Sequence, residues 1–435
     1  MTEAAGPFRL SKAQSGIIFI ILSMERDPLR VLHVVRQFHP SVGGLEDFVL
    51  ALTKQQRKEG IEAEVATLDR LTRGSGERLP SRDTVDGVPV RRIGYFGSAK
   101  YPIAAGILKK LHGFDLVHVH AVDFFCDYLA ATRFIHGKPM VLSTHGGFFH
   151  TAFARTLKTL FFSTVTRLSM TQYRCVVADS TNDLDLFRRV TKKRLVMIEN
   201  GVNTKKFAGV GSPHFAPTLL YIGRFSVNKG LDKMVDAFDV IANEIPGARL
   251  HIVGNDFDGL YPRLQQRIAG LRNGGNIQVH MGLSDEGICD VMKACSFLVS
   301  ASEYEGFGQT VVEAMSAGLL PIVNRIKSFE TILGATSIGL LTDFSAPSVA
   351  GKQAAAFMQR TKLRYGEART AAMTASERYN WEGTAQRFAE IYEEVLGTGD
   401  VVRPSRDGAR GRRLDAGSGQ LPLERPASKV GADLP

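Results

Sequence analysis

Short apolar runs alternate with amphipathic segments along most of the chain. Residues 29–35 form an apolar run typical of a buried strand, and residues 45–59 then carry an apolar residue every three or four positions. The second pattern predicts a helix that ends at Gly60. Further strands are predicted at 63–67, 88–93, 116–120 and 139–144. Strands that alternate with helices predict a parallel sheet covered by helices on both faces.

The same alternation begins again near residue 201. Strands are predicted at 218–222, 249–253, 277–280, 297–300 and 320–323, with helical segments between them. A chain of 435 residues is too long for one ordinary core and fits two domains. We therefore expect an α/β protein with an extension at 1–28, Rossmann-like units at 29–200 and 201–375, a C-terminal helix at 376–398 and a tail at 399–435. The tail is rich in Gly, Pro, Arg and Asp and is expected to be disordered.

The composition excludes several classes of protein. With 44% hydrophobic and 23% charged residues it is ordinary for a soluble globular protein. The four cysteines contain no C-x-x-C pair, so neither a zinc site nor a disulfide framework is indicated, and a reducing cytoplasm is the expected setting. The apolar run at 16–22 has about seven residues, whereas a helix that spans a bilayer needs roughly 20.

Positive charge is concentrated in the first half of the chain. Residues 1–200 hold 28 Lys/Arg and 19 Asp/Glu, a net charge of +9, whereas residues 201–400 hold 19 and 21. This excess favours an anionic membrane surface, a phosphorylated acceptor or nucleic acid. Zinc-finger, helix-turn-helix and RNA-binding signatures are lacking, so no nucleic-acid partner is predicted. The segment 148–170 has three basic residues, five Phe and no acid, which fits either a helix at a membrane interface or an internal helix.

The loops that follow the predicted strands carry the residues best suited to bind a ligand. In open α/β sheets, ligands bind beyond the carboxyl ends of the strands. The two units contribute loops of this kind at Gly43 and Gly44, 144–147, 223–230, Gly254 and 303–310. Because these loops are divided between both units, the sequence predicts an interdomain cleft.

The segment 302–318 holds the most specific pattern in the chain. It follows a strand, and its second half is predicted to be a helix that ends at its last glycine. Gly306 and Gly308 allow backbone N–H groups to approach a diphosphate, and the helix N-terminus adds the positive end of its dipole. Of the two acids, Glu305 in the loop and Glu313 one turn inside the helix, one can accept hydrogen bonds from sugar hydroxyls and the other from a ribose diol.

Two further loops support a site for a phosphorylated ligand. Arg224 and Lys229 lie five residues apart after a predicted strand, and two fixed cations suit a leaving pyrophosphate. Taken alone, the pair also fits a solvated basic loop. Gly43 and Gly44 open a predicted helix and can cradle a phosphate or form a plain tight turn. Their spacing is not the G-x-G-x-x-G of a dinucleotide site, which argues against an NAD enzyme.

Histidines occur at the predicted strand ends as well. His145 lies beside two glycines at the predicted cleft, which favours a functional role. His33, His118 and His120 lie in or beside strands and are interpreted as structural.

Two D-x-D pairs match a motif that elsewhere binds a metal and a nucleotide. Asp183 and Asp185 follow a Ser-Thr-Asn sequence and are interpreted as the start of a helix, and Asp256 and Asp258 as a polar loop. No metal ligand is therefore predicted.

With these motifs the chain resembles glycosyltransferase family 4 over roughly residues 30–398. Glu305 and Glu313 match the family's pair of acids, Arg224 and Lys229 match its basic pair, and His145 matches its cleft histidine. The resemblance implies the GT-B fold, in which two Rossmann-like domains with parallel sheets face an interdomain cleft. The first domain would bind the acceptor and the second the nucleotide sugar. Glu305 would contact the donor sugar, Glu313 the ribose, and the basic pair the diphosphate.

The predicted catalytic residues are Glu305, His145, Arg224 and Lys229. The predicted donor-binding residues are Gly43, Gly44, Arg224, Lys229, Gly254, Gly306, Phe307, Gly308 and Glu313, and the predicted acceptor-binding residues are Thr144, His145 and Asp123.

Within the family, the stretches 34–44, 136–150, 226–230 and 305–308 are most similar to the α-1,3-mannosyltransferases of xanthan and acetan assembly. This resemblance implies GDP-mannose as donor, a diphosphopolyprenyl-linked disaccharide of the cellobiose type as acceptor, retention at the anomeric carbon and a peripheral position on the inner face of the bacterial plasma membrane. No cofactor or metal is expected, because Arg224 and Lys229 can stabilise the leaving diphosphate. The alternatives are a UDP-hexose donor, another glycan acceptor, another enzyme on the same fold, or a non-catalytic nucleotide-sugar binding protein.

Overall fold

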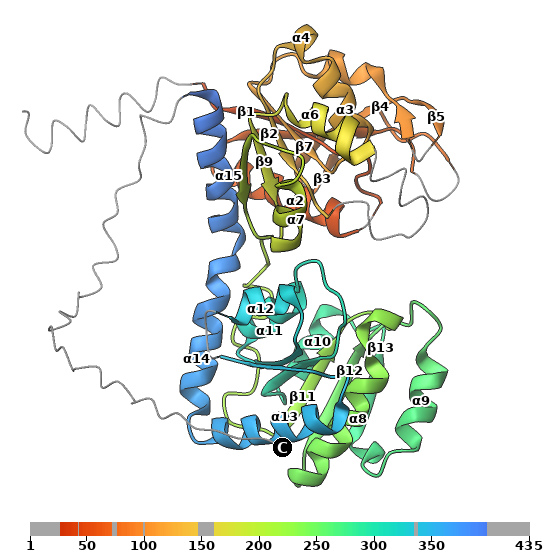
Figure 1. Ribbon diagram of the computed structural model, residues 1–435, viewed down its shortest axis with the longest axis vertical. Coiled ribbons are helices and arrows are strands. Elements are labelled where there is room, and N and C mark those ends of the chain that lie inside the picture. Colours follow the sequence, from red (N-terminus) through yellow and green to blue (C-terminus); the bar gives the residue numbers. More distant parts are fainter. Residues whose placement is uncertain are drawn as a thin grey trace, which may run out of the picture.

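The computed structural model describes residues 27–41, 43–71, 76–98, 101–146, 161–334 and 338–397. Within this part the chain forms two α/β halves, one above the other in Figure 1. The expected extension, apart from its last two residues, and the expected tail lie outside the described residues, as do residues 148–160 of the apolar and basic segment at 148–170. Among the described residues, no helix combines the length and the hydropathy that crossing a bilayer requires.

The first half is built on a sheet of eight strands. In spatial order these are β10 (Arg194–Met197), β9 (Cys175–Ala178), β8 (Met140–Ser143), β7 (Leu116–His120), β1 (Arg30–Val34), β2 (Glu62–Leu68), β4 (Val88–Ile93) and β3 (Arg82–Val85). All neighbours pair in parallel except β3 and β4. The strands predicted from apolar runs are all present, whereas β3, β9 and β10 were not predicted; the residues of β3 are mostly polar and exposed. A small hairpin, β5 (Phe96–Ser98) and β6 (Tyr101–Ile103), follows β4.

Helices cover both faces of this sheet, as predicted. They are α2 (Gly44–Lys58), the 3-10 helix η1 (Ala105–Lys110), α3 (Phe124–Ala131), α4 (Arg133–His136), the π-helical turn η3 (Phe162–Thr166), α6 (Arg167–Met170) and α7 (Thr181–Phe187). Two separate apolar clusters result: one packs beneath α3, α6 and α7, and the other beneath α2. Apolar burial on both faces explains why the central strands are continuous apolar runs.

The second half has a sheet of six strands, all parallel. In spatial order these are β13 (Ile277–Met281), β12 (Arg249–Gly254), β11 (Thr218–Ile222), β14 (Phe297–Ser300), β15 (Leu320–Asn324) and β16 (Leu340–Thr342). The five strands predicted from the sequence are present, and β16 is an addition. The connecting helices are η4 (Val227–Lys229), α8 (Leu231–Glu244), α9 (Tyr261–Ala269), η5 (Gly274–Asn276), α10 (Asp285–Met292), α11 (Gln309–Ala317), α12 (Lys327–Leu333) and α13 (Pro347–Lys362).

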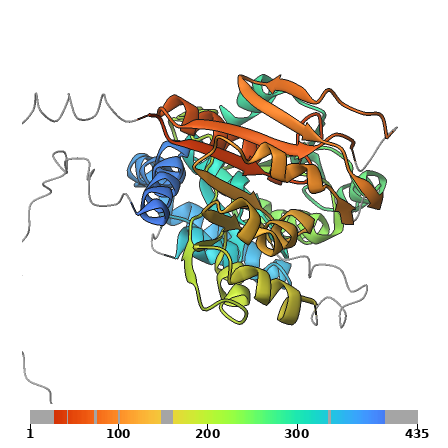
Figure 2. The same ribbon diagram turned by 90° about the horizontal axis from the view of Figure 1, so that it is seen from above.

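The chain ends by returning to the first half. Helix α14 (Tyr365–Ser376) packs on the second half, the 3-10 turn η6 (Glu377–Tyr379) follows, and α15 (Trp381–Leu396) runs alongside the first sheet (Figures 1 and 2, blue). Phe388 and Tyr392 of α15 are buried in the same apolar cluster as α2. The core of the first half therefore contains residues from both ends of the chain.

Strand β12 ends at a glycine that lies against another backbone. A Cβ atom on Gly254 would lie 1.9 Å from the carbonyl oxygen of Gly223, and backbone cannot move aside as a flexible side chain can. Gly254 therefore allows the ends of β11 and β12 to approach each other.

We expect Gly254→Ala to lower the free energy of unfolding by about 1–3 kcal/mol, the usual cost of overpacking. Gly275→Ala is the matched control, because a Cβ there meets nothing within 4 Å. Urea denaturation of both variants measures the difference. Equal stability of the two variants would contradict this account of Gly254.

Candidate active site

The carboxyl ends of the two sheets meet at a cavity of about 430 Å³. Its lining from the first half consists of Gly44, Leu45, His145, Asp179 and Asn200. The second half contributes the loops after β11 and β14 and the start of α11, together with Phe329 of α12. The interdomain cleft predicted from the sequence is therefore present.

The predicted site residues divide into two groups. Those that line the cavity are Gly44, His145, Arg224, Lys229, Glu305, Phe307 and Gly308. Those that are absent from the described lining are Gly43, Asp123, Thr144, Gly254, Gly306 and Glu313.

One cation and one acid of the cleft form an ion pair. Nζ of Lys229 lies 2.6 Å from Oε1 of Glu305, and both side chains are mostly buried. Lys229 is the last residue of η4, whereas Glu305 lies in the loop between β14 and α11. Arg224 lies in the same loop as Lys229 and stacks on the ring of Phe257, 4.9 Å from its centroid. Both cations and the carboxylate of Glu305 therefore line one cavity.

The N-terminus of α11 opens into the same cavity. Residues 308–311 line it, and the first N–H groups of a helix have no partner within the helix. Gly308 caps the helix with φ +103°, and a Cβ there would lie 2.9 Å from the Phe329 ring. A glycine is thus required both by the backbone angle and by the packing. This geometry suits the binding of a phosphate group.

Glu313 lies one turn inside α11, beside the cavity. Its Oε1 accepts a hydrogen bond of 3.2 Å from Gln309, which does line the cavity. Burial raises the pKa of Glu313, and the positive charge of Lys206 partly offsets this effect. The predicted contact with a ribose stays a prediction.

The loop after β8 holds His145 in an unusual backbone conformation. His145 has φ +50° and Gly146 has φ +77°. One oxygen of Asp183, in α7, accepts hydrogen bonds from Oγ1 of Thr144 at 2.5 Å and from the backbone N–H of Gly146 at 2.8 Å. A left-handed conformation in a residue with a side chain costs on the order of 1–3 kcal/mol and persists only when the surroundings impose it. Asp183 is the group that imposes it here.

The first D-x-D pair is the start of a helix, as predicted. Ser180 caps α7, and Asp183 supports the His145 loop. In the second pair, Asp256 accepts hydrogen bonds from the backbone at the start of α9, and Asp258 accepts one from Val227.

His145 is neutral at neutral pH. Burial lowers its pKa to about 4, and its Nε2 lies 2.9 Å from Nδ1 of His120. Its ring packs edge-on against Phe48, with ring centroids 4.7 Å apart. His145 can therefore exchange a hydrogen bond with a ligand but does not contribute a positive charge.

Two polar residues of the cleft were missed in the sequence. Asp179 follows β9, and burial together with the neighbouring Asp183 raises its pKa to about 7. Asn200 follows the last strand of the first sheet. One oxygen in each side chain is buried without a hydrogen-bond partner among the described residues. The signal in the sequence for Asp179 is its place directly after the short apolar run Cys175–Ala178, which forms β9.

Two of the remaining predicted residues, Asp123 and Gly43, are the N-caps of helices. Asp123 caps α3, where it accepts a hydrogen bond of 2.9 Å from Phe125, and burial raises its pKa to about 6. Gly43 is the N-cap of α2 in extended backbone. Whether either residue also binds a ligand stays a prediction.

Two α/β halves whose strand ends close on a cavity with paired cations, an acid and a helix N-terminus define a GT-B glycosyltransferase. Residues 202–368 match the model of the glycosyl transferases group 1, and residues 42–206 match that of Glycosyltransferase Family 4. The chain belongs to glycosyltransferase family 4.

Several known proteins are similar to this chain in sequence or in fold. The chain is 42% identical, over 85% of its length and 98% of the relative's, to the GDP-mannose:cellobiosyl-diphosphopolyprenol alpha-mannosyltransferase of Xanthomonas oryzae pv. oryzae. It is 41% identical, over 85% of its length and 94% of the relative's, to the protein of the same name from Komagataeibacter xylinus. A solved glycosyltransferase from Rickettsia africae, 19% identical, superposes with a TM-score of 0.66 over 85% of this chain and 99% of that one.

Acid should destabilise the protein because histidines are buried in their neutral form. Burial lowers the pKa of His33 and of His145 from 6.5 to about 4, and it lowers those of His118 and His120 as well. Between about pH 6.5 and pH 4 the unfolded chain therefore binds more protons at these four side chains, so the free energy of unfolding falls as the pH falls. The raised pKa values of Asp123, Asp179 and Glu313 act in the opposite direction, but these are three groups against four histidines.

We expect the net slope to exceed that of a single histidine, which is about 1.4 kcal/mol per pH unit. Urea denaturation at a series of pH values between 7 and 4.5 measures it. The exposed His112 serves as control, since His112→Gln should leave the slope unchanged. A free energy of unfolding that is independent of pH across this window would contradict the prediction.

Proposed function

We propose that the protein transfers mannose from GDP-mannose to a diphosphopolyprenyl-linked disaccharide of the cellobiosyl type, with retention and with an α-1,3 linkage. The observation that carries the proposal is 40–42% identity to three transferases with this donor and acceptor in their names, over nearly their whole length. The cleft supports it, because its cations, its carboxylate and its helix N-terminus meet at one cavity.

The ion pair suggests how the donor is received. The charge of Lys229 is balanced by Glu305, 2.6 Å away. An entering diphosphate competes for Lys229, and with Arg224 it gains two cations, since charge-assisted hydrogen bonds to phosphate are strong. Glu305 is then free to accept hydrogen bonds from the hydroxyls of mannose. The N-terminus of α11 adds N–H donors to the same diphosphate.

In the transfer step, the bond between C1 of mannose and the phosphate oxygen breaks, and GDP leaves with the bonding electrons. Arg224 and Lys229 stabilise the charge that develops on the diphosphate. The acceptor hydroxyl attacks C1 from the same face, and its proton passes to an oxygen of the departing phosphate. The donor carries its phosphate in the α configuration, so attack from this face gives an α-linked product.

The first half supplies the acceptor side. His145, Asp179 and Asn200 line the cavity opposite the donor loops. One oxygen each of Asp179 and Asn200 is buried without a partner in the described part of the chain, and both are suited to accept hydrogen bonds from sugar hydroxyls.

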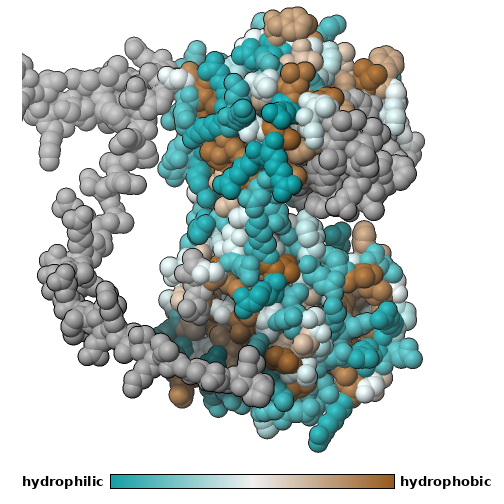
Figure 3. All heavy atoms as spheres, viewed as in Figure 1, coloured by the Kyte–Doolittle hydropathy of each residue, from teal (hydrophilic) through white to brown (hydrophobic). Residues whose placement is uncertain are grey.

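A membrane surface is the proposed location of the acceptor. Phe134 and Ile135 of α4 are 85% and 61% exposed, and Arg133 precedes them. The hairpin β5–β6 adds exposed Phe96 and Ile103. In Figure 3, hydrophobic residues gather at the top of the first half, over α4 and beside the hairpin. Together with the positive charge of this half, these residues suit contact with anionic lipid.

Purified protein is expected to transfer mannose from radiolabelled GDP-mannose to lipid extracts that contain cellobiosyl-diphosphopolyprenol, in buffer with EDTA. Release of the label by an α-mannosidase checks the linkage. UDP-glucose and lipid without the disaccharide are the controls. Turnover with UDP-glucose alone would overturn the donor assignment. A requirement for Mg²⁺ or Mn²⁺ would overturn the expectation that the two cations suffice.

Glu305 and Glu313 are expected to act at different stages. A contact with the sugar can strengthen as C1 becomes positively charged, whereas a contact with the ribose is present before and during the reaction. Glu305→Gln should therefore lower kcat, and Glu313→Gln should raise the KM for GDP-mannose, each by roughly 10- to 150-fold, from 1.5–3 kcal/mol per charged hydrogen bond. Steady-state kinetics of both variants tests the division. An unchanged kcat in Glu305→Gln would exclude its assigned role.

A further inference from the structure

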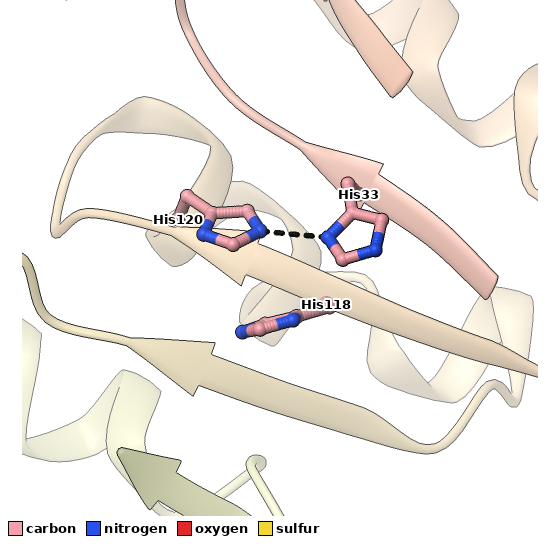
Figure 4. Close-up of side chains that lie close together, drawn as sticks. All are labelled: His33, His118 and His120. Atoms are coloured by element: carbon pink, nitrogen blue, oxygen red, sulfur yellow. Dashed lines mark hydrogen bonds between the residues drawn. The ribbon is translucent and has the colours of Figure 1, made fainter. Parts of the chain in front are cut away.

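A network of seven polar side chains, all buried except the partly exposed His145, begins at His145 and runs beneath the cleft. His145 contacts His120, which contacts His33; Figure 4 shows this second contact, between β7 and β1. The network continues through Gln56 of α2 and Tyr392 of α15 to His118 and Ser143. The successive distances are 2.9, 2.9, 2.7, 3.1, 2.7 and 2.8 Å. We call these seven residues the histidine network.

Three of these histidines have the spacing of metal ligands. One nitrogen from each of His33, His118 and His120 lies within 4.8 Å of the others. However, all six of their ring nitrogens already have a hydrogen-bond partner. A metal ion would have to break several of these bonds, so the cluster is better explained as a closed hydrogen-bond network.

The orientation of Gln56 determines where each proton lies. The amide nitrogen of Gln56 donates to the hydroxyl of Tyr392, so its oxygen faces Nε2 of His33. An amide oxygen can only accept, so Nε2 of His33 carries a proton. His33 is neutral, and its Nδ1 is therefore an acceptor that requires a proton on Nε2 of His120. By the same reasoning, Nε2 of His145 donates to Nδ1 of His120.

The first member of the network lies in the cleft. His145 lines the cavity, and its Nδ1 has no partner among the described residues. We propose that the histidine network holds His145 as the tautomer with its proton on Nε2, and thereby presents the Nδ1 lone pair to the cleft as an acceptor for a sugar hydroxyl. Gln56 and Tyr392 are positioning residues in this arrangement. The contribution to transfer rests on the proposed function, whereas the tautomer does not.

Reversal of one amide reverses the whole network. If Gln56 turned over, its nitrogen would donate to His33, and the protons of His33, His120 and His145 would all move to the other ring nitrogen. His145 would then present an N–H donor to the cleft and could no longer accept the proton of a ligand hydroxyl. A residue 89 positions before His145 in the sequence thus selects the chemistry of the cleft histidine.

The test combines a spectroscopic and a kinetic measurement. The tautomer of His145 is determined from long-range ¹H–¹⁵N correlation spectra of ligand-free, ¹⁵N-histidine-labelled protein, with signals assigned by comparison with His145→Asn. We expect a neutral ring with its proton on Nε2. In Gln56→Met, which keeps the side-chain volume but removes the amide, we expect the Nδ1–H form of His145 to become populated. With GDP-mannose as donor, kcat should fall about 2- to 10-fold, as for the loss of one neutral hydrogen bond, with a smaller change in donor KM.

Two further variants keep the outcome interpretable. Thr53→Val is the matched control: Thr53 is also buried in α2, but its hydroxyl donates only to Val49 within that helix, so the tautomer and kcat should not change. Tyr392→Phe, in α15, removes the hydroxyl that accepts a hydrogen bond from the Gln56 amide nitrogen. It should shift the tautomer of His145 in the same direction as Gln56→Met.

The outcomes separate this proposal from the proposed function. A proton on Nδ1 of His145 in the unaltered protein, or a His145 tautomer that is the same in Gln56→Met, Tyr392→Phe and the unaltered protein, would overturn the role of the network. The expected tautomers without mannosyl transfer would support the network and count against the proposed donor or acceptor.

Discussion

The packing of α15 against the first sheet is the contact on which the cleft depends. The chain leaves the first half near residue 200 and returns near residue 380, so two crossings hold the halves together. Phe388, Ile391 and Tyr392 of α15 are buried against α2, and full burial of a large apolar side chain contributes about 1.5–3 kcal/mol. At the crossings, Glu199 pairs with Arg378 at 2.9 Å, and Gly201 lies so close to the ring of Trp381 that a Cβ there would lie 2.4 Å from it.

Several polar side chains of the cleft have hydrogen-bond or ion-pair partners within their own half of the protein. On one side, Glu305 neutralises Lys229. On the other side, Asp183 holds the strained loop of His145, and the histidine network saturates one nitrogen of the ring. These polar side chains of the site therefore hold one another in place: binding exchanges one set of polar contacts for another instead of ordering loose side chains, which lowers the entropic cost of association.

The strands that are buried on both faces of a sheet, and the loops that follow them, could be predicted from the sequence. The central strands and α11 were predicted because buried parallel strands are apolar along their whole length and because Gly318 ends the helix. Lys229 and Glu305 were predicted to share a site because carboxyl ends of parallel strands gather at one edge. Strand β3 was missed because it is exposed and polar, and β9 because it has only four residues, so Asp179 at its end was missed too.

Other features depend on contacts between distant segments. The amphipathic pattern of α15 shows that one face is buried, but not that α2 and the first sheet cover it. The alternation of His118 and His120 along β7 shows that they share a face, while the register that places His33 beside His118 is set by how β1 pairs with β7. The interpretation of these histidines as structural is consistent with their burial, but it did not include their link to His145.

The return of α15 also determines how this architecture can be recombined. Because α15 completes the core of the first half, that half is encoded by two separate stretches of the gene, one before residue 200 and one after residue 380. A functional exchange of donor-binding halves between relatives needs two junctions, one near residue 200 and one near residue 380, so that α15 travels with the sheet it covers. A single junction near residue 200 would pair the α2 of one protein with the α15 of another. It would also separate Gln56 from the tyrosine with which it shares a hydrogen bond.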